Sequence, residues 1–311
     1  MATRRSRQYR NPPTRPVDGI VLLDKPAGIS SNKALQQVRG LFAADKAGHT
    51  GSLDPLATGL LPICLGEACK VAGVLLAERK AYETLIRLGV DTDTDDAEGT
   101  VVATRPVPAL DPAALDATLR EFTGRIAQVP PRYSALKRDG EALYARARRG
   151  ELIRIDARDV DVFAIDVLAI GTDTLRLRIE CGSGTYIRSL ARDIGARLGC
   201  GGHVETLRRL WVEPFRNPAM FTLEALAELA AQSRERIDAT LLPIESGLAG
   251  YPRFSLDAEQ AHRVRHGVRI RVDPALAPGA YAVSGPDGLV FALVEFAEDR
   301  LLRIQRLLHR G

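Results

Sequence analysis

The stretch Gly48-His49-Thr50-Gly51-Ser52-Leu53-Asp54-Pro55-Leu56-Ala57-Thr58-Gly59 decides how the rest of the chain is interpreted. Its glycines let the backbone pass close to a ligand, and Pro55 restricts the conformation of Asp54. We therefore expect a stiff loop that presents the Asp54 carboxylate. A simple turn, in which Asp54 bonds to neighbouring amides, is the alternative that this stretch alone leaves open. No Gly-Lys-Ser/Thr sequence follows, so it is not a phosphate-binding loop.

Regular elements are expected on both sides of this loop. Upstream, residues 19–24 form an apolar run typical of a buried strand, and Ser30 or Ser31 can cap a helix that follows it. The apolar face of that helix carries residues at helical spacing, namely Ala34, Leu35, Val38 and Phe42. Downstream, the pattern predicts strands over residues 60–65 and 82–88, with a helix over residues 67–78 between them.

The later elements mix without a regular strand–helix–strand repeat. We expect a helix from Asp111-Pro112, strands over residues 160–170 and 175–181, and a helix over residues 186–198. This order predicts an α+β fold with a mixed, largely antiparallel sheet flanked by helices. From residue 249 the pattern changes to one short helix and brief strands, typical of a small β-barrel-like unit.

Three regions follow from these patterns: a disordered basic tail over residues 1–17, a main unit over residues 18–248 and a small β-rich unit over residues 249–311. The chain has 311 residues, of which 45% are hydrophobic and 26% charged, as in ordinary globular proteins. It contains no apolar run of membrane-spanning length and no signal-like start, so we expect a cytoplasmic protein. Targeting to an organelle by the Arg-rich start is the alternative.

The distribution of charge and the number of cysteines restrict the kind of polyanion-binding surface and the kind of cross-linking that the chain can have. The first sixteen residues hold five arginines and no acid, which leaves 38 basic against 39 acidic residues in the rest of the chain. A polyanion site must therefore be a local patch, because phosphate contacts need clustered Lys and Arg. Four scattered cysteines do not form a disulfide framework.

A second informative stretch, residues 182–190, leads from an expected strand into an expected helix. It places Tyr186 and Arg188 at the helix start. Taken alone, such a pair is usually core packing plus a surface charge. A cation close to a partly buried carboxylate, however, keeps that carboxylate ionised and nucleophilic, which would give Arg188 a role beside Asp54.

Two metal-like patterns are discounted. The acidic run at Asp91, Asp93, Asp95 and Asp96 departs from a calcium loop, because the sixth position is Asp96 instead of Gly and the twelfth is Val102 instead of Glu. The segment from Cys200 to His203 has metal-like spacing but no matching pair elsewhere, so a glycine turn is the better interpretation.

Five ordered motifs resemble those of the TruB family of tRNA pseudouridine synthases. They are residues 21–28, residues 48–68, Lys80-Ala81-Tyr82, residues 184–188 and the string His203-Val204-Glu205-Thr206-Leu207-Arg208-Arg209. The likeness covers about residues 19–216. It implies a pseudouridine synthase fold and the isomerisation of the T-loop uridine at tRNA position 55, by breaking the glycosidic bond, turning the base and rejoining it through C5.

The resemblance also implies roles for individual residues. Asp54 matches the nucleophile, Arg188 its ion-pair partner, and Tyr82 the tyrosine that stacks on the uracil and handles the C5 proton. Binding or structural positions are matched by His49, Tyr186, Leu207 and, with a mainly structural role, Lys25. No metal or cofactor is implied, since an aspartate, a neighbouring cation and an apolar wall suffice for the reaction. A flipped base must be offered an aromatic surface in exchange, which suits Tyr82 and Tyr186.

The expected partner is tRNA, bound at its T-loop and acceptor stem by a monomer that needs no protein partner and no membrane. The basic segment 132–158 resembles the family's RNA-contacting insertion, and the small C-terminal unit resembles a PUA-type RNA-binding domain. Two rivals stay open. One is an RNA-binding module in which the loop serves only as scaffold, and the other is a related synthase subunit that takes its target from a guide RNA and protein partners.

Overall fold

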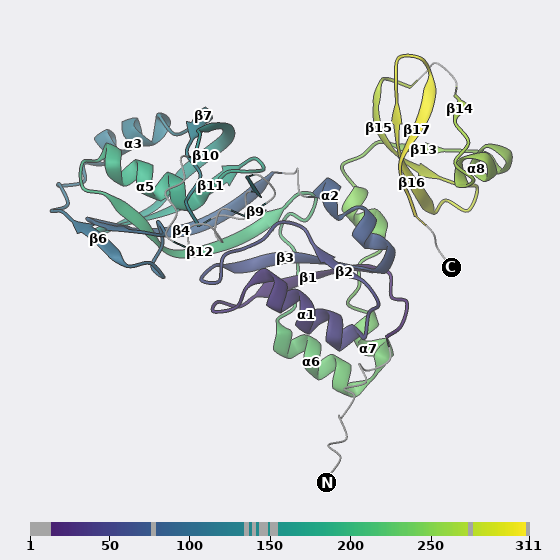
Figure 1. The fold of residues 1–311 in the computed structure, drawn as a ribbon, viewed down its shortest axis with the longest axis horizontal. Helices are drawn as coiled ribbons and strands as arrows, with labels where there is room; N and C mark the ends of the chain where they lie inside the picture. Colours follow the sequence, from purple (N-terminus) through teal and green to yellow (C-terminus); the bar gives the residue numbers. More distant parts are fainter. Residues whose placement is uncertain are drawn as a thin grey trace, which may run out of the picture.

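The computed structural model describes residues 14–75, 79–133, 137–138, 141–142, 149, 155–272 and 276–308. Its centre is an eight-stranded sheet with the order β1-β3-β12-β4-β11-β10-β7, and β2 pairs with β3 off this path (Figure 1). The strands are β1 (Gly19–Lys25), β2 (Ala47–His49), β3 (Thr58–Leu65), β4 (Lys80–Leu88), β7 (Gly124–Gln128), β10 (Arg158–Ile170), β11 (Thr174–Cys181) and β12 (Gly202–Val212).

The sheet is antiparallel at every junction except the one between β3 and β12. That junction is short, because only Thr58 and Gly59 pair with Arg208 and Arg209. At Gly59 the backbone has φ +96°, and an added Cβ would lie 2.2 Å from the Arg209 carbonyl oxygen. A glycine is therefore required where the two halves of the sheet meet. The expected α+β fold with a mixed, largely antiparallel sheet is confirmed.

One face of the sheet is covered along its length, and the other face is covered at β1 and β3. Successive residues of β1 alternate between two apolar clusters, with Val21 and Leu23 in one and Ile20 and Leu22 in the other, as the period of a strand requires. In the first cluster, five helices pack against the sheet. They are α1 (Ser31–Phe42), α3 (Pro112–Arg120), α5 (Ile187–Arg197), α6 (Leu223–Gln232) and α7 (Arg234–Asp238). In Figure 1, α1 and α6 lie together below β1, whereas α3 and α5 lie beside β10 and β11.

Local capping explains why two of the predicted helices begin where they do. The Ser30 side chain accepts a hydrogen bond from the Lys33 amide at the start of α1, and Asp111 does the same for Ala114 at the start of α3. One expected helix is wrong: residues 67–78 contain a 3-10 turn, η1 (Gly66–Lys70), and the four-residue α2 (Ala72–Leu75). Gly66 has φ +55°, and its added Cβ would meet the Val17 carbonyl at 2.4 Å, so this segment follows the close packing of its neighbours and not its helical periodicity.

The C-terminal unit has its own sheet and core. Five strands in the order β13-β15-β16-β17-β14 curl around a separate apolar cluster, and α8 (Ala258–Arg265) packs beside them (Figure 1). The strands are β13 (Arg253–Ser255), β14 (Ile270–Arg271), β15 (Gly279–Ser284), β16 (Val290–Phe296) and β17 (Leu301–Leu307). The second apolar cluster joins this unit to the main sheet through η2 (Ile244–Leu248), and Lys70 donates to the Leu307 carbonyl across the junction at 2.9 Å.

The ends of the main unit hold the remaining elements. The strands β5 (Val90–Thr92) and β6 (Val101–Thr104) form a hairpin that carries the acidic run. Arg15 pairs with Asp238, and Val17 is buried, so contacts with the fold begin inside the expected tail of residues 1–17. Most of the basic insertion 132–158 lies outside the described residues, which include the short pair β8 (Lys137–Arg138) and β9 (Glu141–Ala142). Across the described part of the chain, no helix is long and apolar enough to span a membrane.

Candidate active site

The loop between β2 and β3 is held in place by its backbone. The Ser31 hydroxyl accepts from the Leu53 amide at 2.7 Å and donates to the Leu53 carbonyl at 2.9 Å, which fixes the loop to the first residue of α1. The Pro55 carbonyl accepts from the Gly28 amide at 2.8 Å. Asp54 stands between these two anchored residues, so its carboxylate is presented by a rigid backbone, as the sequence predicts.

Lys25 also helps to hold the loop between β2 and β3 in place. Its side chain is fully buried, and its ammonium donates to the carbonyls of Ile29 at 2.7 Å, Pro26 at 2.8 Å and Pro55 at 3.3 Å. Burial lowers the pKa of Lys25 to about 8, and the charge of Asp54 opposes that fall. Lys25 therefore supports the loop and does not line the pocket, in keeping with the mainly structural role expected of it.

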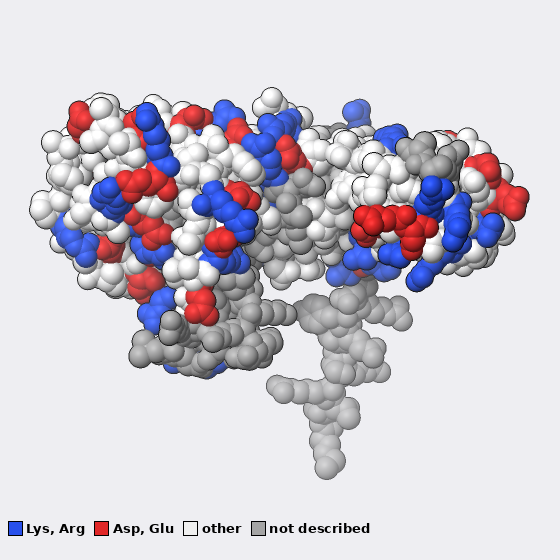
Figure 2. Space-filling model, turned by 90° about the horizontal axis from the view of Figure 1, so that it is seen from above, with Lys and Arg blue, Asp and Glu red and all other residues white. Residues whose placement is uncertain are grey.

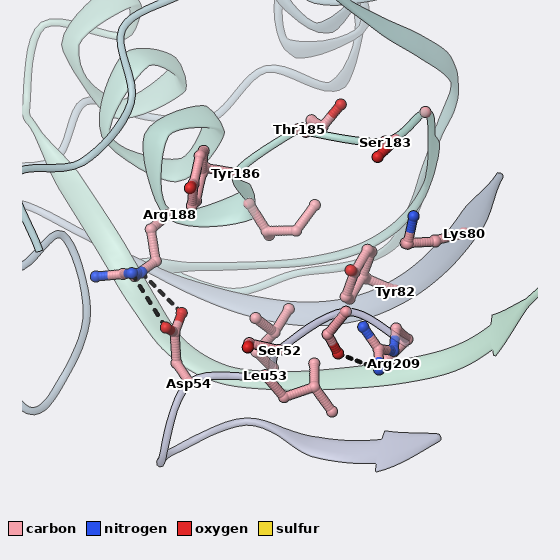
Figure 3. Close-up of a pocket in the computed structure, with 15 residues that line it drawn as sticks. Ser52, Leu53, Asp54, Lys80, Tyr82, Ser183, Thr185, Tyr186, Arg188 and Arg209 are labelled. Atoms are coloured by element: carbon pink, nitrogen blue, oxygen red, sulfur yellow. Dashed lines mark hydrogen bonds and ion pairs between the residues drawn. The ribbon is translucent and has the colours of Figure 1, made fainter. Parts of the chain in front are cut away.

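Asp54 and Arg188 meet across the cleft between the loop and α5 (Figure 3). Arg188 donates from Nη2 to Asp54 Oδ1 at 3.1 Å, and its Nε lies 2.9 Å from Oδ2, so the guanidinium faces both carboxylate oxygens. The Arg188 side chain is only 4% exposed, whereas that of Asp54 is 37% exposed. The cation is thus fixed in the protein and the carboxylate has one side open to a ligand.

Asp96, on the β5–β6 hairpin, is a second carboxylate that contacts the Arg188 guanidinium. Its Oδ2 lies 3.4 Å from Arg188 Nη1, and its side chain is 5% exposed. Arg188 also donates to the carbonyls of Thr94 at 3.0 Å and Tyr133 at 2.9 Å. Sequence reasoning missed Asp96 because the acidic run was weighed only as a local metal loop, and no local signal indicates that this hairpin reaches α5.

The apolar wall of the site comes from three residues of different elements. Tyr82 on β4 and Leu207 on β12 are nearly buried, and Tyr186 lies immediately before the first residue of α5. With Asp54 and Arg188 they line a cavity of about 280 Å³ (Figure 3). Gln128 holds the backbone of Tyr186 by bonding to both its amide and its carbonyl, at 2.8 and 3.1 Å.

Two further cations, Lys80 and Arg209, line the same cavity and had been given no role. Arg209 is 1% exposed, donates from Nε to the Leu60 carbonyl at 2.7 Å and from Nη2 to the Gly51 carbonyl at 3.1 Å, and lies opposite Tyr82 in the strand register. A signal was present in the sequence, because strand period places Arg209 on the same face as Leu207.

His49 lies on β2, just before the loop, and is not among the residues that line the cavity. Its ring is partly buried, and its Nδ1 has no hydrogen-bond partner among the described residues. Burial lowers the pKa of His49, and the charge of Arg209 adds to that effect. The role expected of His49 at a bound nucleotide stays a prediction.

Burial also sets the acidity of the two reactive groups. It raises the pKa of the Asp54 carboxyl above its usual range, and Arg188 opposes the rise while Asp96 adds to it. It likewise raises the pKa of the Tyr82 phenol, against the opposing charge of Arg209. The charge of Arg188 therefore favours the negative form of Asp54, and the charge of Arg209 favours that of Tyr82.

The arrangement suits covalent attack by a carboxylate on a planar substrate. A nucleophilic oxygen faces an open cavity, and its partner cation holds it in one orientation. The aromatic and aliphatic wall accommodates a flat ring that has left its stack. Within the described residues, no three His, Cys, Asp or Glu side chains come together as a metal site requires.

Charged side chains are distributed unevenly on the face seen in Figure 2. Lys and Arg alternate with Asp and Glu over the main unit, and over the C-terminal unit at the right end a row of blue side chains lies between two groups of red ones. Four exposed arginines lie in or just after α8 there, namely Arg263, Arg265, Arg269 and Arg271. This is the local basic patch that a polyanion requires of a chain with little net charge.

Comparisons with known proteins agree with this geometry. The model of the TruB family pseudouridylate synthase (N terminal domain) matches residues 39–187. The tRNA pseudouridylate synthase B C-terminal domain matches residues 188–249, and the C-terminal model of tRNA pseudouridine synthase II matches residues 251–302.

Relatives and solved structures match nearly the whole chain. The tRNA pseudouridine synthase B of Xanthomonas euvesicatoria is 60% identical over 94% of each chain, and that of Stutzerimonas stutzeri is 47% identical over 94% of this chain and 96% of its own. Chains from an H/ACA RNP bound to a substrate RNA containing 2'-deoxyuridine and from a Cbf5-Nop10-Gar1 complex superpose with TM-scores of 0.73, at 23% and 25% identity. Each covers 94% of this chain and 85% of its own.

Proposed function

The chain belongs to the TruB family of tRNA pseudouridine synthases and isomerises uridine to pseudouridine, and from this premise we propose that it acts on the T-loop uridine at tRNA position 55 with Asp54 as nucleophile. The observation that carries the proposal is the rigid Asp54 carboxylate, held by Arg188 and open to the cavity on its other side.

The reaction proceeds on a uridine swung out of its loop into the cavity. The uracil stacks on Tyr82, while Tyr186 and Leu207 replace the contacts it leaves behind. When Asp54 attacks the sugar, its carboxylate oxygen bonds to C1' as the C1'–N1 bond breaks, and the electron pair of that bond stays with the base. The base then turns and C5 bonds to C1', which releases the Asp54 carboxylate. C5 loses its proton, in which Tyr82 takes part, and N1 gains one, so that atoms and charge balance.

Recognition of the rest of the RNA falls to surfaces outside the cavity. The PUA-like C-terminal unit presents its exposed arginines, among them Arg263 and Arg265, to the acceptor stem. The resemblance to the family implies that the basic segment 132–158, most of which lies outside the described residues, contacts the T-loop. Because both binding surfaces and the reactive groups belong to one chain, the protein works as a monomer without a protein partner. Its place of action is the cytoplasm, where tRNA is its substrate.

The experiment that tests this function uses the purified chain and an unmodified tRNA transcript. Pseudouridine is detected by tritium release from C5-labelled uridine and mapped by primer extension, and its appearance at position 55 is the expected result. RNA binding without tritium release would leave only the binding-module rival. Activity that requires added guide RNA and proteins would favour the guide-directed rival.

The role of Asp54 is tested by Asp54→Asn. The amide keeps the shape of the carboxylate but is not a nucleophile, so product should disappear while the dissociation constant for tRNA changes little. The control is Asp159→Asn, which breaks only an exposed ion pair with Arg125 at the sheet edge and should leave the rate unchanged. Turnover retained in Asp54→Asn would remove Asp54 from the mechanism.

A further inference from the structure

Arg209 is a buried cation that no carboxylate among the described residues pairs with. Its guanidinium is 1% exposed, and in the described part of the chain its hydrogen bonds go to two backbone carbonyls while no carboxylate pairs with it. Arg188, by contrast, is shared by Asp54 and Asp96. Keeping a charge away from water without a partner of opposite sign is costly, so the fold retains Arg209 at the expense of stability.

The position of Arg209 relates this charge to the substrate. It lines the cavity beside Tyr82, at the end away from the pair formed by Asp54 and Arg188 (Figure 3). A uridine whose ribose faces Asp54 directs its base toward Tyr82, and therefore toward Arg209. Two carbonyl bonds, to Gly51 and Leu60, hold the guanidinium in this place before any ligand arrives.

The reaction develops negative charge at that end of the cavity. When the C1'–N1 bond breaks, the base keeps the bonding electrons, and the charge spreads over N1 and the two carbonyl oxygens. Attack on the base instead of the sugar also places charge on a base oxygen. In both cases the uracil is neutral when it binds and anionic only as the reaction proceeds, so a fixed cation there stabilises the transition state more than the substrate.

We propose that Arg209 is the residue that stabilises the anionic uracil, a role separate from the Asp54–Arg188 pair. The inference rests on the proposed function. It identifies a second arginine whose uncompensated charge acts on the base, while Arg188 acts on the nucleophile. The adjacent Arg208 provides a contrast, because its side chain is 41% exposed and forms a fork-like pair with Asp24 at 2.8 and 2.9 Å.

The test compares two tRNAs, one with uridine and one with 5-fluorouridine at the target position, in single-turnover reactions. Fluorine withdraws electrons and stabilises the base anion by itself, so a fluorinated base has less need of the cation. Arg209→Gln, which keeps N–H donors but not the charge, should slow loss of uridine about 10²-fold and loss of 5-fluorouridine several-fold less. Arg209→Lys keeps the charge and should retain the wild-type ratio of the two rates even where both fall. Arg208→Met is the matched control for that ratio.

The outcomes separate the inference from its alternatives. Equal losses on the two tRNAs in Arg209→Gln would show a purely structural role and overturn the proposal, as would no loss at all. A deuterium isotope effect at C5 that increases in Arg209→Gln would also overturn it, because Arg209 would then act through Tyr82 on proton removal. If the Gln variant does not fold, Arg209→Lys replaces it in the test. A ratio of the uridine and 5-fluorouridine rates in Arg209→Lys that differs from that of wild type would then overturn the proposal. Failure of the wild-type chain to modify either tRNA would refute the proposed function instead.

Discussion

Replacement of Arg188 by lysine tests whether charge alone is enough at the nucleophile. The guanidinium spans two carboxylates, with Nε and Nη2 on Asp54 and Nη1 toward Asp96, and it also donates to two carbonyls. A lysine ammonium concentrates its donors on one atom and does not reach all these partners at once. Arg188→Lys therefore keeps the positive charge but loses the orientation of Asp54.

The expected size of the effect follows from the bonds that are lost. One hydrogen bond to a charged group contributes about 1.5–3 kcal/mol, which corresponds to about a ten- to hundred-fold loss of rate if it is made in the transition state. The hydrogen bond counted here is the one to Asp54, since the contact with Asp96 at 3.4 Å is an ion pair only. Because water screens the partly exposed Asp54, we expect a loss toward the lower end of this range.

The assay is single-turnover formation of pseudouridine with enzyme in excess, alongside a measurement of tRNA binding. We expect the single-turnover rate constant to fall and the dissociation constant to stay within a few-fold of wild type. Arg192→Lys is the matched control, since Arg192 lies one turn later on α5 and pairs with Asp95 at 2.9 Å, outside the cavity. An Arg188→Lys rate within a few-fold of wild type would refute the argument that the fork positions the nucleophile.

Three further predictions concern the same cavity. Asp96→Asn removes a charge that raises the pKa of Asp54, so the acid limb of the pH profile of kcat/KM should move to lower pH, while its plateau falls because Arg188 is held less well. Tyr82→Phe keeps the stacking ring but not the hydroxyl, so tRNA binding should persist while tritium release from C5 slows. Gly59→Ala should lower the free energy of unfolding by about 2 kcal/mol or more in urea denaturation, because its Cβ would meet the Arg209 carbonyl oxygen in a left-handed backbone.

Each of these has a result that contradicts it. An acid limb that moves to higher pH in Asp96→Asn would reverse the assigned sign of the Asp96 effect. Tritium release at the wild-type rate in Tyr82→Phe would remove the hydroxyl from proton transfer. For the glycine, the control is Gly28→Ala, at φ +80° with no atom within 4 Å of the added Cβ, and an equal loss of stability in both variants would mean that the close approach at Gly59 is not the cause.

The sequence predicted the parts of the site that depend on local patterns. The loop around Asp54 follows from its glycines and Pro55, and α1 follows from its cap and its apolar face. The partnership of Asp54 with Arg188 came from the order of the motifs, since 134 residues separate the two side chains. The helix expected over residues 67–78 was wrong because the close packing of Gly66 overrides periodicity.

The residues that were missed depend on pairing between distant strands. Arg208 and Arg209 are neighbours, and a shift of one residue in the register of β12 would exchange the exposed arginine for the buried one. Asp96 reaches Arg188 only because the β5–β6 hairpin folds toward α5. No composition or spacing within a single segment shows that this hairpin reaches Arg188, whereas for Arg209 the strand period indicates the face that it shares with Leu207.

The two arginines of the cavity act at different stages because their surroundings differ in charge. Asp54 and Asp96 share the charge of Arg188, and the buried Lys25 ammonium also acts on Asp54, so the charges at the nucleophile's end nearly balance before the substrate arrives. Arg209 has no carboxylate partner in the described part of the chain, and its end is cationic. A neutral uracil gains little from this division of charge, whereas a base that has taken up the glycosidic electrons is drawn toward Arg209. The same field that favours bond cleavage thus holds the released base at the Tyr82 end, where it can turn and present C5 to the sugar.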